Sequence, residues 1–180
     1  NDRMSVWDKK IFSFSNSAFG LDLSDLSVKV VNMKENGKEK EVISFGSADI
    51  PQGSINDGEI EVQENVVRAI KKAVALAGPK KIKTKRVICS LPETKAFLRI
   101  ISLPEMKSNE VQEAIKWEIE ANIPMSADQV YYDWQILDKS LTKEKGKMDI
   151  LVVAFSKKVI NQFLETLELA GLEVVGMEIE

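Results

Sequence analysis

The chain has 180 residues, of which 44% are hydrophobic and 29% are charged, and it carries a formal net charge of −3. This is an ordinary globular composition, and its acidic balance argues against a nucleic-acid-binding domain, so that any basic partner-binding surface must be local. The absence of histidine and the presence of a single cysteine, Cys89, exclude histidine-based triads, internal disulfides and imidazole or multi-thiolate metal sites.

The sequence also predicts the compartment of the protein and the extent of the natural chain. Residues 1–17, which we interpret as an N-terminal extension, lack the apolar stretch and cleavage site of a signal peptide. No apolar run reaches the roughly 18–20 residues that cross a bilayer. We therefore expect a cytoplasmic protein in which Cys89 is buried and reduced. Because a domain rarely ends on an alternating apolar strand, we also expect the natural chain to continue past Glu180.

Strands are predicted over much of the first 50 residues. Apolar side chains alternate in residues 19–24 and again in 27–33, so these segments predict a hairpin that turns at Asp25. A third strand is predicted within residues 41–50, after a polar turn. Together the three segments predict a meander of neighbouring strands.

A helix and a basic link follow. After a predicted loop over residues 51–58, apolar residues recur at helical spacing from Glu61 until Gly78-Pro79, which ends the helix: Val62, Val66, Ile70, Ala73 and Ala77. The run Lys80–Arg86 then carries five basic residues. Such a run is typical of a solvated linker, but it would also attract anionic lipid headgroups, at about 1 kcal/mol per charge near a membrane surface.

The next segment predicts a compact α+β unit. Two strands, one helix and two further strands follow one another over residues 87–90, 96–103, 108–122, 129–137 and 147–155. The helix is predicted to have Ser108 as its N-cap, and it ends before Pro124 because proline disfavours helical geometry at the preceding residue. The alternation over 129–137 places Tyr132 and Trp134 on one strand face and Tyr131 on the other.

The last predicted elements are a helix over residues 157–170 and a strand over 172–179. Gly171 lies where a helix commonly ends in a left-handed residue. The apolar face of this helix is formed by Val159, Ile160, Phe163, Leu164 and Leu167.

Two polar residues interrupt the apolar side of the helix that begins at Ser108. Glu118 and Asn122 fall within its apolar arc, and two interpretations stay open. Either their side chains hydrogen-bond to neighbouring backbone or lie at an exposed end of the arc. Alternatively, they grip a peptide whose apolar groups are received by Trp117, Ile119 and Ile123.

Three stretches resemble the PilM family of type IV pilus assembly proteins, which are relatives of actin: Phe19–Val31, Glu113–Pro124 and Ala170–Ile179. The resemblance implies an α/β fold of the α+β kind, in which an actin-like (ribonuclease H-like) core subdomain carries an inserted strand-helix-strand-strand (SHS2-like) subdomain. The implied division is 1–17 for the extension, 18–83 and 156–180 for the two parts of the core, and 84–155 for the insert. This chain would supply one lobe of a two-lobed protein.

The resemblance implies that the first hairpin is a phosphate-binding loop, with five candidate residues: Asp22, Ser24, Asp25, Ser27 and Lys29. Asp22 would contact magnesium through water, and ATP with Mg²⁺ would bind only to the full-length protein, because the other lobe lies beyond Glu180. Two residues depart from the family pattern, since Ser24 stands where glycine is usual and Asp25 adds negative charge beside the phosphate. Taken alone, the hairpin is typical of an ordinary turn.

The resemblance also implies a partner. PilM-like proteins bind the short N-terminal tail of a PilN-like inner-membrane protein in a cleft between core and insert, and this favours the peptide-gripping interpretation. The candidate cleft residues are Trp117, Glu118, Ile119, Asn122, Ile123 and Pro124. The protein would then be a scaffold at the cytoplasmic face of the inner membrane, with peripheral membrane contact and self-association as further expectations.

Other functions stay open. The full-length protein could be an actin-like ATPase whose turnover drives pilus assembly, or an FtsA-like cell-division protein that polymerises at the membrane. The cytoplasmic domain of the type II secretion L protein is a further relative of the same kind. No catalytic or metal-ligating residue is assigned, and no catalysis is expected of this chain by itself.

Overall fold

The computed structural model describes residues 18–36, 39–123, 125–138 and 146–179. The chain divides into two compact units, Asn1–Thr94 with Asn161–Glu180 and Lys95–Ile160. None of the helices among the described residues is long and apolar enough to cross a membrane.

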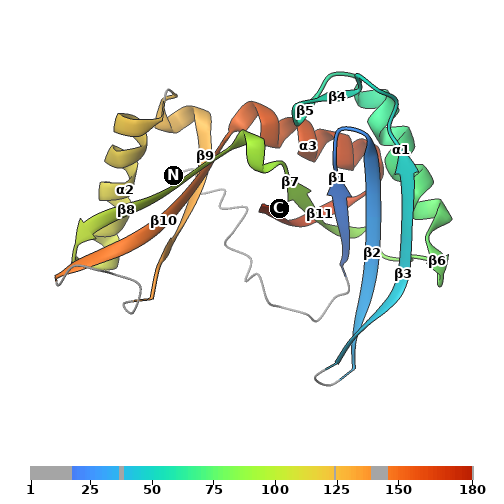
Figure 1. Ribbon diagram of the computed structural model, residues 1–180, viewed down its shortest axis with the longest axis horizontal. Coiled ribbons are helices and arrows are strands. Elements are labelled where there is room, and N and C mark those ends of the chain that lie inside the picture. Colours follow the sequence, from blue (N-terminus) through green and yellow to red (C-terminus); the bar gives the residue numbers. More distant parts are fainter. Residues whose placement is uncertain (1–17, 37–38, 124, 139–145, 180) are drawn as a thin grey trace. The chain divides into compact units, whose positions relative to one another are not determined.

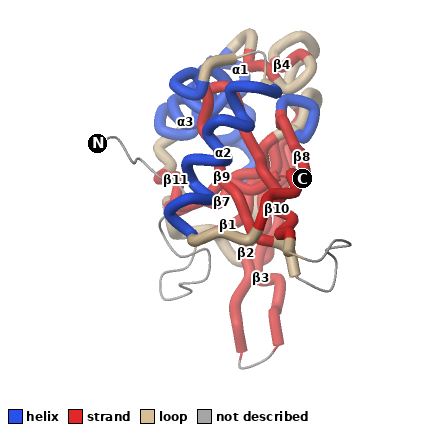
Figure 2. Tube along the Cα trace, turned by 90° about the vertical axis from the view of Figure 1, so that its left-hand side faces the viewer, coloured by secondary structure: helices blue, strands red, loops and turns tan. Residues whose placement is uncertain are grey.

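The first unit is built on a six-stranded mixed sheet with the order β11-β7-β1-β2-β3-β6 (Figure 1). The predicted hairpin and third strand are present as an antiparallel meander, and β7 and β11 add to it in parallel. The bounds are β1 Phe19–Leu23, β2 Ser27–Asn36, β3 Glu39–Asp49, β6 Gly78–Pro79, β7 Arg86–Leu91 and β11 Glu173–Ile179. The β2–β3 hairpin extends well beyond the neighbouring strands (Figure 2).

One face of this sheet is covered by helix. The helix α1, Gln63–Leu76, packs against β2 and β3, and the close approach requires Gly46, where an added Cβ would lie 2.5 Å from the carbonyl oxygen of Ala73. The helix α3, Lys157–Leu169, ends at Gly171 with φ +84°, as predicted. Alternate residues of the strands and the apolar residues of the helices form the buried core: Phe19, Leu21, Val28, Val30, Val66, Ile70, Val87, Phe163 and Leu167.

A small hairpin replaces part of the predicted loop over residues 51–58. Strands β4, Ile55–Asn56, and β5, Glu59–Ile60, pair antiparallel around Asp57 and Gly58. Both turn residues have positive φ, 49° and 74°, which is the geometry of the tight turn that Asp-Gly favours between two strands. The prediction of an unstructured loop missed this signal.

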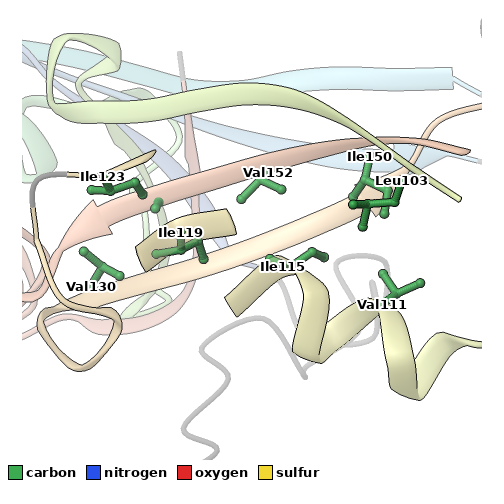
Figure 3. Packing of buried hydrophobic residues seen from close by; sticks show 9 residues of the cluster. Leu103, Val111, Ile115, Ile119, Ile123, Val130, Ile150 and Val152 are labelled. Atoms are coloured by element: carbon green, nitrogen blue, oxygen red, sulfur yellow. The ribbon is translucent and has the colours of Figure 1, made fainter. Parts of the chain in front are cut away.

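The second unit is a three-stranded antiparallel sheet, order β8-β10-β9, with one helix on it. The bounds are β8 Ala96–Pro104, α2 Ser108–Asn122, β9 Val130–Ile136 and β10 Lys147–Ser156, with 3-10 turns at Glu93–Lys95 and Ala127–Gln129. The apolar side of α2 packs on the strands (Figure 3). The core comprises Leu103, Val111, Ile115, Ile119, Ile123, Val130, Ile150, Val152 and Ala154, with Tyr132 and Trp134 packed against it.

The predicted order of elements is confirmed, but the predicted start of the insert at Thr84 is wrong. Strand β7 pairs in parallel with β1, so it belongs to the six-stranded sheet, and the second unit begins at Lys95. A pairing between two strands so distant in sequence leaves no local signal in the alternation of either strand. The predicted end of the insert, residue 155, lies five residues before the observed one, Ile160.

Candidate functional site

Five polar side chains form a row across the face of the six-stranded sheet that faces away from the buried core. Strand register places them on five neighbouring strands, from β11 to β3: Glu178, Ser90, Asp22, Lys29 and Ser47. We call this set the polar row. Each member alternates with a buried neighbour on its strand, so the row lies on the opposite side from the core.

Asp22 lies at the centre of the polar row and is held from both sides. The Ser90 hydroxyl donates to its Oδ1 at 2.8 Å, and the Lys29 ammonium donates to its Oδ2 at 3.3 Å. Lys29 and Asp22 form an ion pair whose side chains remain accessible to solvent, at 63% and 30% exposure. The pair therefore contributes about 0–1 kcal/mol to stability. The arrangement fixes the direction of the Asp22 carboxylate more than it stabilises the fold.

A second row lies beside the polar row and is apolar. Register aligns Gly176, Ile88, Gly20, Val31 and Phe45 across the same strands. A hollow of about 620 Å³ opens over both rows, and Gly20, which has no side chain, is among its lining residues. The hollow is lined largely by apolar groups, with the polar row along it, which is the usual composition of a small-molecule site.

The structure brings together only part of the predicted phosphate loop. Asp22 and Lys29 line the hollow, while Ser24 and Ser27 close the turn on each other. The Ser24 backbone N–H donates to the Ser27 carbonyl at 3.0 Å, and the two hydroxyl oxygens lie 3.1 Å apart. The Ser24 N–H is therefore committed within the hairpin instead of pointing at a ligand.

Asp25 is directed elsewhere. Its two carboxylate oxygens accept the backbone N–H groups of Asp57 and Gly58, each at 3.1 Å, so it holds the β4–β5 hairpin against the β1–β2 turn. Two donors on one carboxylate satisfy its charge locally. The negative charge that the sequence placed beside a phosphate is thus committed to a structural contact.

Cys89 carries no chemistry at this site. Its side chain is fully buried on the covered face of β7, next to Ser90 on the open face. Burial raises the pKa of the Cys89 thiol to about 12, and the nearby Asp22 carboxylate adds to the effect. The thiol therefore stays protonated and unreactive at neutral pH. Among the described residues, no group of three or more His, Cys, Asp and Glu is arranged to hold a metal.

The residues predicted to line the partner cleft lie on α2 or directly after it, and they differ in how far they are buried. Trp117 is 71% exposed, whereas Ile119 and Ile123 are 2% and 5% exposed and belong to the core. The prediction that Ile119 and Ile123 offer pockets to a peptide is therefore wrong, because the apolar arc of α2 packs fully on its sheet. Pro124 lies outside the described residues.

Glu118 and Asn122 make the local hydrogen bonds of the first interpretation, and their contact with a peptide stays a prediction. The Asn122 amide donates to the Glu118 carbonyl at 2.9 Å and to its carboxylate at 3.0 Å, at the accessible end of the helix. Arg99 of β8 in turn donates to Asn122 Oδ1 at 3.1 Å. We define the α2 surface as Trp117, Glu118 and Asn122.

Four residues of these sites were missed from the sequence. Ser90 and Glu178 join the polar row through parallel strand pairing, Ser47 joins it through the pairing of β3 with β2, and Arg99 reaches α2 from β8. No local pattern identifies Ser90 and Glu178, because register between distant strands decides their neighbours. For Arg99, a charged residue inside an apolar strand was the available signal.

Comparison with known proteins gives consistent results. A family model described as type IV pilus assembly protein PilM matches residues 20–180. Over 71 residues the chain is 32% identical to the type II secretion system protein L of Xanthomonas campestris pv. campestris, which covers 39% of this chain and 18% of that protein.

Two solved structures are similar. The chain resembles the PilM-PilN type IV pilus biogenesis complex with a TM-score of 0.76 and 26% identity, over 90% of this chain and 47% of that one. It resembles the cytoplasmic domain of EpsL, an inner membrane component of the type II secretion system of Vibrio cholerae, with a TM-score of 0.54 and 14% identity, over 91% of this chain and 57% of that one. The second likeness shows the fold alone. The predicted α/β, actin-like fold class is confirmed, and the chain spans less than two thirds of each relative.

Proposed function

The chain belongs to the family of the type IV pilus assembly protein PilM, and from this premise we propose that it is a non-catalytic scaffold that captures the tail of an inner-membrane partner. Its relatives are components of type IV pilus and type II secretion assembly. The observation that carries the proposal is the fold match to a protein whose structure was solved with PilN. The proposed partner is a PilN-like protein.

The α2 surface supports this role. An exposed tryptophan is unusual on a soluble helix, and tryptophan is enriched among the residues that dominate binding energy at interfaces. On the same helix, the chain of hydrogen bonds from Arg99 through Asn122 to Glu118 presents polar groups in fixed positions. We propose that Trp117 anchors the partner and that these polar groups orient it.

Calorimetric titration tests the scaffold proposal. A synthetic peptide with the N-terminal tail sequence of the PilN-type protein of the same organism should bind the full-length protein with a micromolar Kd. Trp117→Ala should weaken binding about tenfold or more. Leu76→Ala is the matched control, because Leu76 is a comparably exposed apolar residue of α1, at 62%, and should leave the Kd unchanged. A flat titration with wild-type protein would contradict the proposal.

ATP binding is a second candidate function, favoured by the hollow over the polar row. Its volume of about 620 Å³ fits the size of a nucleotide site. The residues that line it could hold two parts of a nucleotide complex, the metal ion and a phosphate group. Asp22 would hold Mg²⁺ through water, and Lys29 would neutralise phosphate charge. The charged phosphate groups of a bound nucleotide would contact this chain and also residues from the other half of the protein. We propose that nucleotide binding in this way modulates assembly of the pilus.

Nucleotide binding is measured with a fluorescent ATP analogue and full-length protein in the presence of Mg²⁺. Asp22→Ala should reduce affinity at least about tenfold, because it removes the oriented carboxylate of the polar row. Asp49→Ala, which removes an exposed carboxylate at the end of β3, should not change it. Equal affinity of wild-type and Asp22→Ala would exclude the polar row as the nucleotide site.

We further propose that the protein works at the cytoplasmic side of the inner membrane, because the proposed PilN-like partner is an inner-membrane protein. Lysines of the link between β6 and β7 would support peripheral contact with anionic lipid, since four of them are exposed: Lys80, Lys81, Lys83 and Lys85. Sedimentation with vesicles of mixed phosphatidylglycerol and phosphatidylcholine measures this contact. Loss of co-sedimentation in 0.5 M salt, at about a 4 Å screening length, is expected if it is electrostatic.

A further inference from the structure

Ser90 joins the polar row from a strand that is distant in sequence, and its hydroxyl is held against Asp22. Strand β7 pairs in parallel with β1, and this register sets Cys89 beside Leu21 and therefore Ser90 beside Asp22. The Ser90 hydroxyl donates to Oδ1 of Asp22 at 2.8 Å in a partly buried setting. Because Cys89 and Leu91, the residues on either side of Ser90, are fully buried, the core fixes the backbone from which this hydroxyl projects.

Lys29, on the other side of Asp22, is held less firmly. It lies directly opposite Asp22 in the antiparallel pair of β1 and β2, and its ammonium is 3.3 Å from Oδ2. The Lys29 side chain is mostly exposed, and an exposed ion pair contributes little free energy. Lys29 can therefore leave Asp22 at little cost, whereas the shorter bond from Ser90 anchors the other carboxylate oxygen.

The two oxygens of the Asp22 carboxylate are thus bound differently, and this bears on metal binding. An aspartate side chain has two rotatable bonds, and a firm hydrogen bond to Oδ1 restricts both of them. The direction of Oδ2 is thereby set, beside Lys29 and at the wall of the hollow. Mg²⁺ keeps several waters in a nearly ideal octahedron, so a carboxylate that accepts from those waters must be well oriented.

The hydroxyl of Ser90 also distinguishes between two carboxylates. Register places Glu178 of β11 on one side of Ser90 and Asp22 on the other, and all three residues line the hollow. A serine hydroxyl has a single proton to donate. In the structure that proton is donated to Asp22. Of the two carboxylates in the polar row, Asp22 is therefore the one whose direction Ser90 fixes.

We infer that Ser90 is a positioning residue of the proposed nucleotide site, which holds the Asp22 carboxylate in the orientation that accepts from the water shell of Mg²⁺. The inference rests on the proposed ATP binding, and it names the residue that makes this binding depend on the metal. Without the Ser90 hydroxyl, the Asp22 carboxylate is free to turn toward the Lys29 ammonium, which then competes with the metal for it. Loss of the hydroxyl should therefore weaken the metal-dependent part of nucleotide binding and spare the rest.

Two substitutions at Ser90 separate the effect of the hydroxyl from that of side-chain shape. Threonine keeps the hydroxyl, valine replaces it with a methyl group of similar size, and both residues favour strands. Full-length wild-type protein, Ser90→Thr and Ser90→Val are titrated with a fluorescent ATP analogue, once with saturating Mg²⁺ and once with EDTA. Wild type and Ser90→Thr should bind about tenfold more tightly with Mg²⁺ than with EDTA. Ser90→Val should lose most of this ratio, while its Kd in EDTA changes less than about twofold.

Ser102→Val is the matched control, because Ser102 also donates its hydroxyl to an aspartate, Asp149, at 2.7 Å, but in the second unit. Its ratio of affinities should equal that of wild type. Equal ratios for Ser90→Thr and Ser90→Val would overturn the inference and leave the proposed ATP binding intact. The same holds if Ser90→Val loses affinity equally with Mg²⁺ and with EDTA, which would give Ser90 a structural role only, or if Mg²⁺ does not affect wild type. Absence of binding by wild type would overturn both proposals.

A double-mutant cycle tests whether Ser90 acts through Asp22. Asp22→Ala alone should remove the metal-dependent part of binding, and adding Ser90→Val to it should then change the Kd in Mg²⁺ by less than about twofold. Additive losses would mean that Ser90 acts independently of Asp22 and would overturn the positioning role. Circular dichroism checks that each variant is folded, and Ser90→Ala takes the place of Ser90→Val in both measurements if the valine variant does not fold.

Discussion

The two sheets of this chain build their candidate sites by different means. The polar row of the six-stranded sheet is assembled by register from five strands, and its outer members, Ser47 and Glu178, are far apart in sequence. The α2 surface comes from one helix whose bounds are set by local spacing. In the first case a residue acquires its neighbours through long-range pairing, and in the second through helical periodicity.

This difference decides which substitutions should be costly. On α2, two residues only two positions apart point to opposite sides of the helix and differ completely in burial, and the helical period itself predicts which of them is buried. In the six-stranded sheet, the cost of a substitution depends on what distant segments bring against the strand.

The largest effect is expected inside the core of the second unit. Ile115 is completely buried on α2, so Ile115→Ala should lower the free energy of unfolding by about 2–5 kcal/mol through lost burial and a residual cavity. Trp117 lies two residues further along the helix, and its side chain is 71% exposed. Trp117→Ala should therefore change the free energy of unfolding by less than about 0.5 kcal/mol. Urea denaturation followed by circular dichroism measures both. Similar costs for the two variants would show that α2 does not pack as described.

A smaller effect is expected where α1 meets β3. At Gly46 an added Cβ would lie 2.5 Å from the Ala73 carbonyl oxygen and 2.9 Å from the Cα of Ala77, both backbone atoms that cannot rotate away. Gly46→Ala should therefore force the helix outward and cost about 1–3 kcal/mol.

Gly176→Ala is the matched control for that prediction. Its added Cβ would meet only the side chain of Ile88, at 3.7 and 3.8 Å, which is ordinary contact distance. The midpoint of thermal unfolding should fall for Gly46→Ala and change little for Gly176→Ala. A neutral Gly46→Ala variant would mean that α1 is not seated on β3 in solution.

The same contrast explains what the sequence could and could not predict. The end of α2 at Asn122, the hairpin at Asp25 and the end of α3 at Gly171 follow from periodicity and turn chemistry, and all three are confirmed. The predicted N-cap of α2, Ser108, is wrong, because the N-cap is Lys107 and Ser108 is the first helical residue. The assignment of β7 to the core sheet, and with it the place of Ser90 beside Asp22, depends on parallel pairing between distant segments. No local pattern contains that information, so the domain boundary at Thr84 was misplaced.

Three of the candidate site residues have structural contacts that the sequence did not predict, for a related reason. Ile119 and Ile123 were assigned to a peptide pocket although their spacing equally fits a core face, and the structure places both in the core. Asp25 was assigned to a phosphate site, but two backbone N–H groups of the β4–β5 turn bind its carboxylate. A sequence pattern specifies the face on which a residue lies, while the partner that covers that face is decided by tertiary packing.

The two faces of β7 give a pH-dependent prediction. The pKa of Cys89 is raised from 9.0 to about 12 in the folded protein by burial and by Asp22, so the unfolded chain loses this proton first as the pH rises. Stability should therefore fall between about pH 9 and pH 12, by up to about 1.4 kcal/mol per pH unit from this group. Cys89→Val should remove this part of the slope. An unchanged slope in the variant would assign the alkaline loss of stability to other groups.

The smallest effect is expected at Arg99, where β8 and α2 are joined by a contact that periodicity did not predict. Arg99→Ala removes the hydrogen bond to Asn122 Oδ1 and the contact with the Phe97 ring, both at an accessible surface, so the free energy of unfolding should fall by less than about 1 kcal/mol. Asn122 retains its bonds to Glu118, so α2 should keep its helical content. A loss of more than about 2 kcal/mol would show that this long-range contact, and not helical packing alone, holds α2 on its sheet. The division between a unit determined by local spacing and a sheet determined by register would then no longer hold.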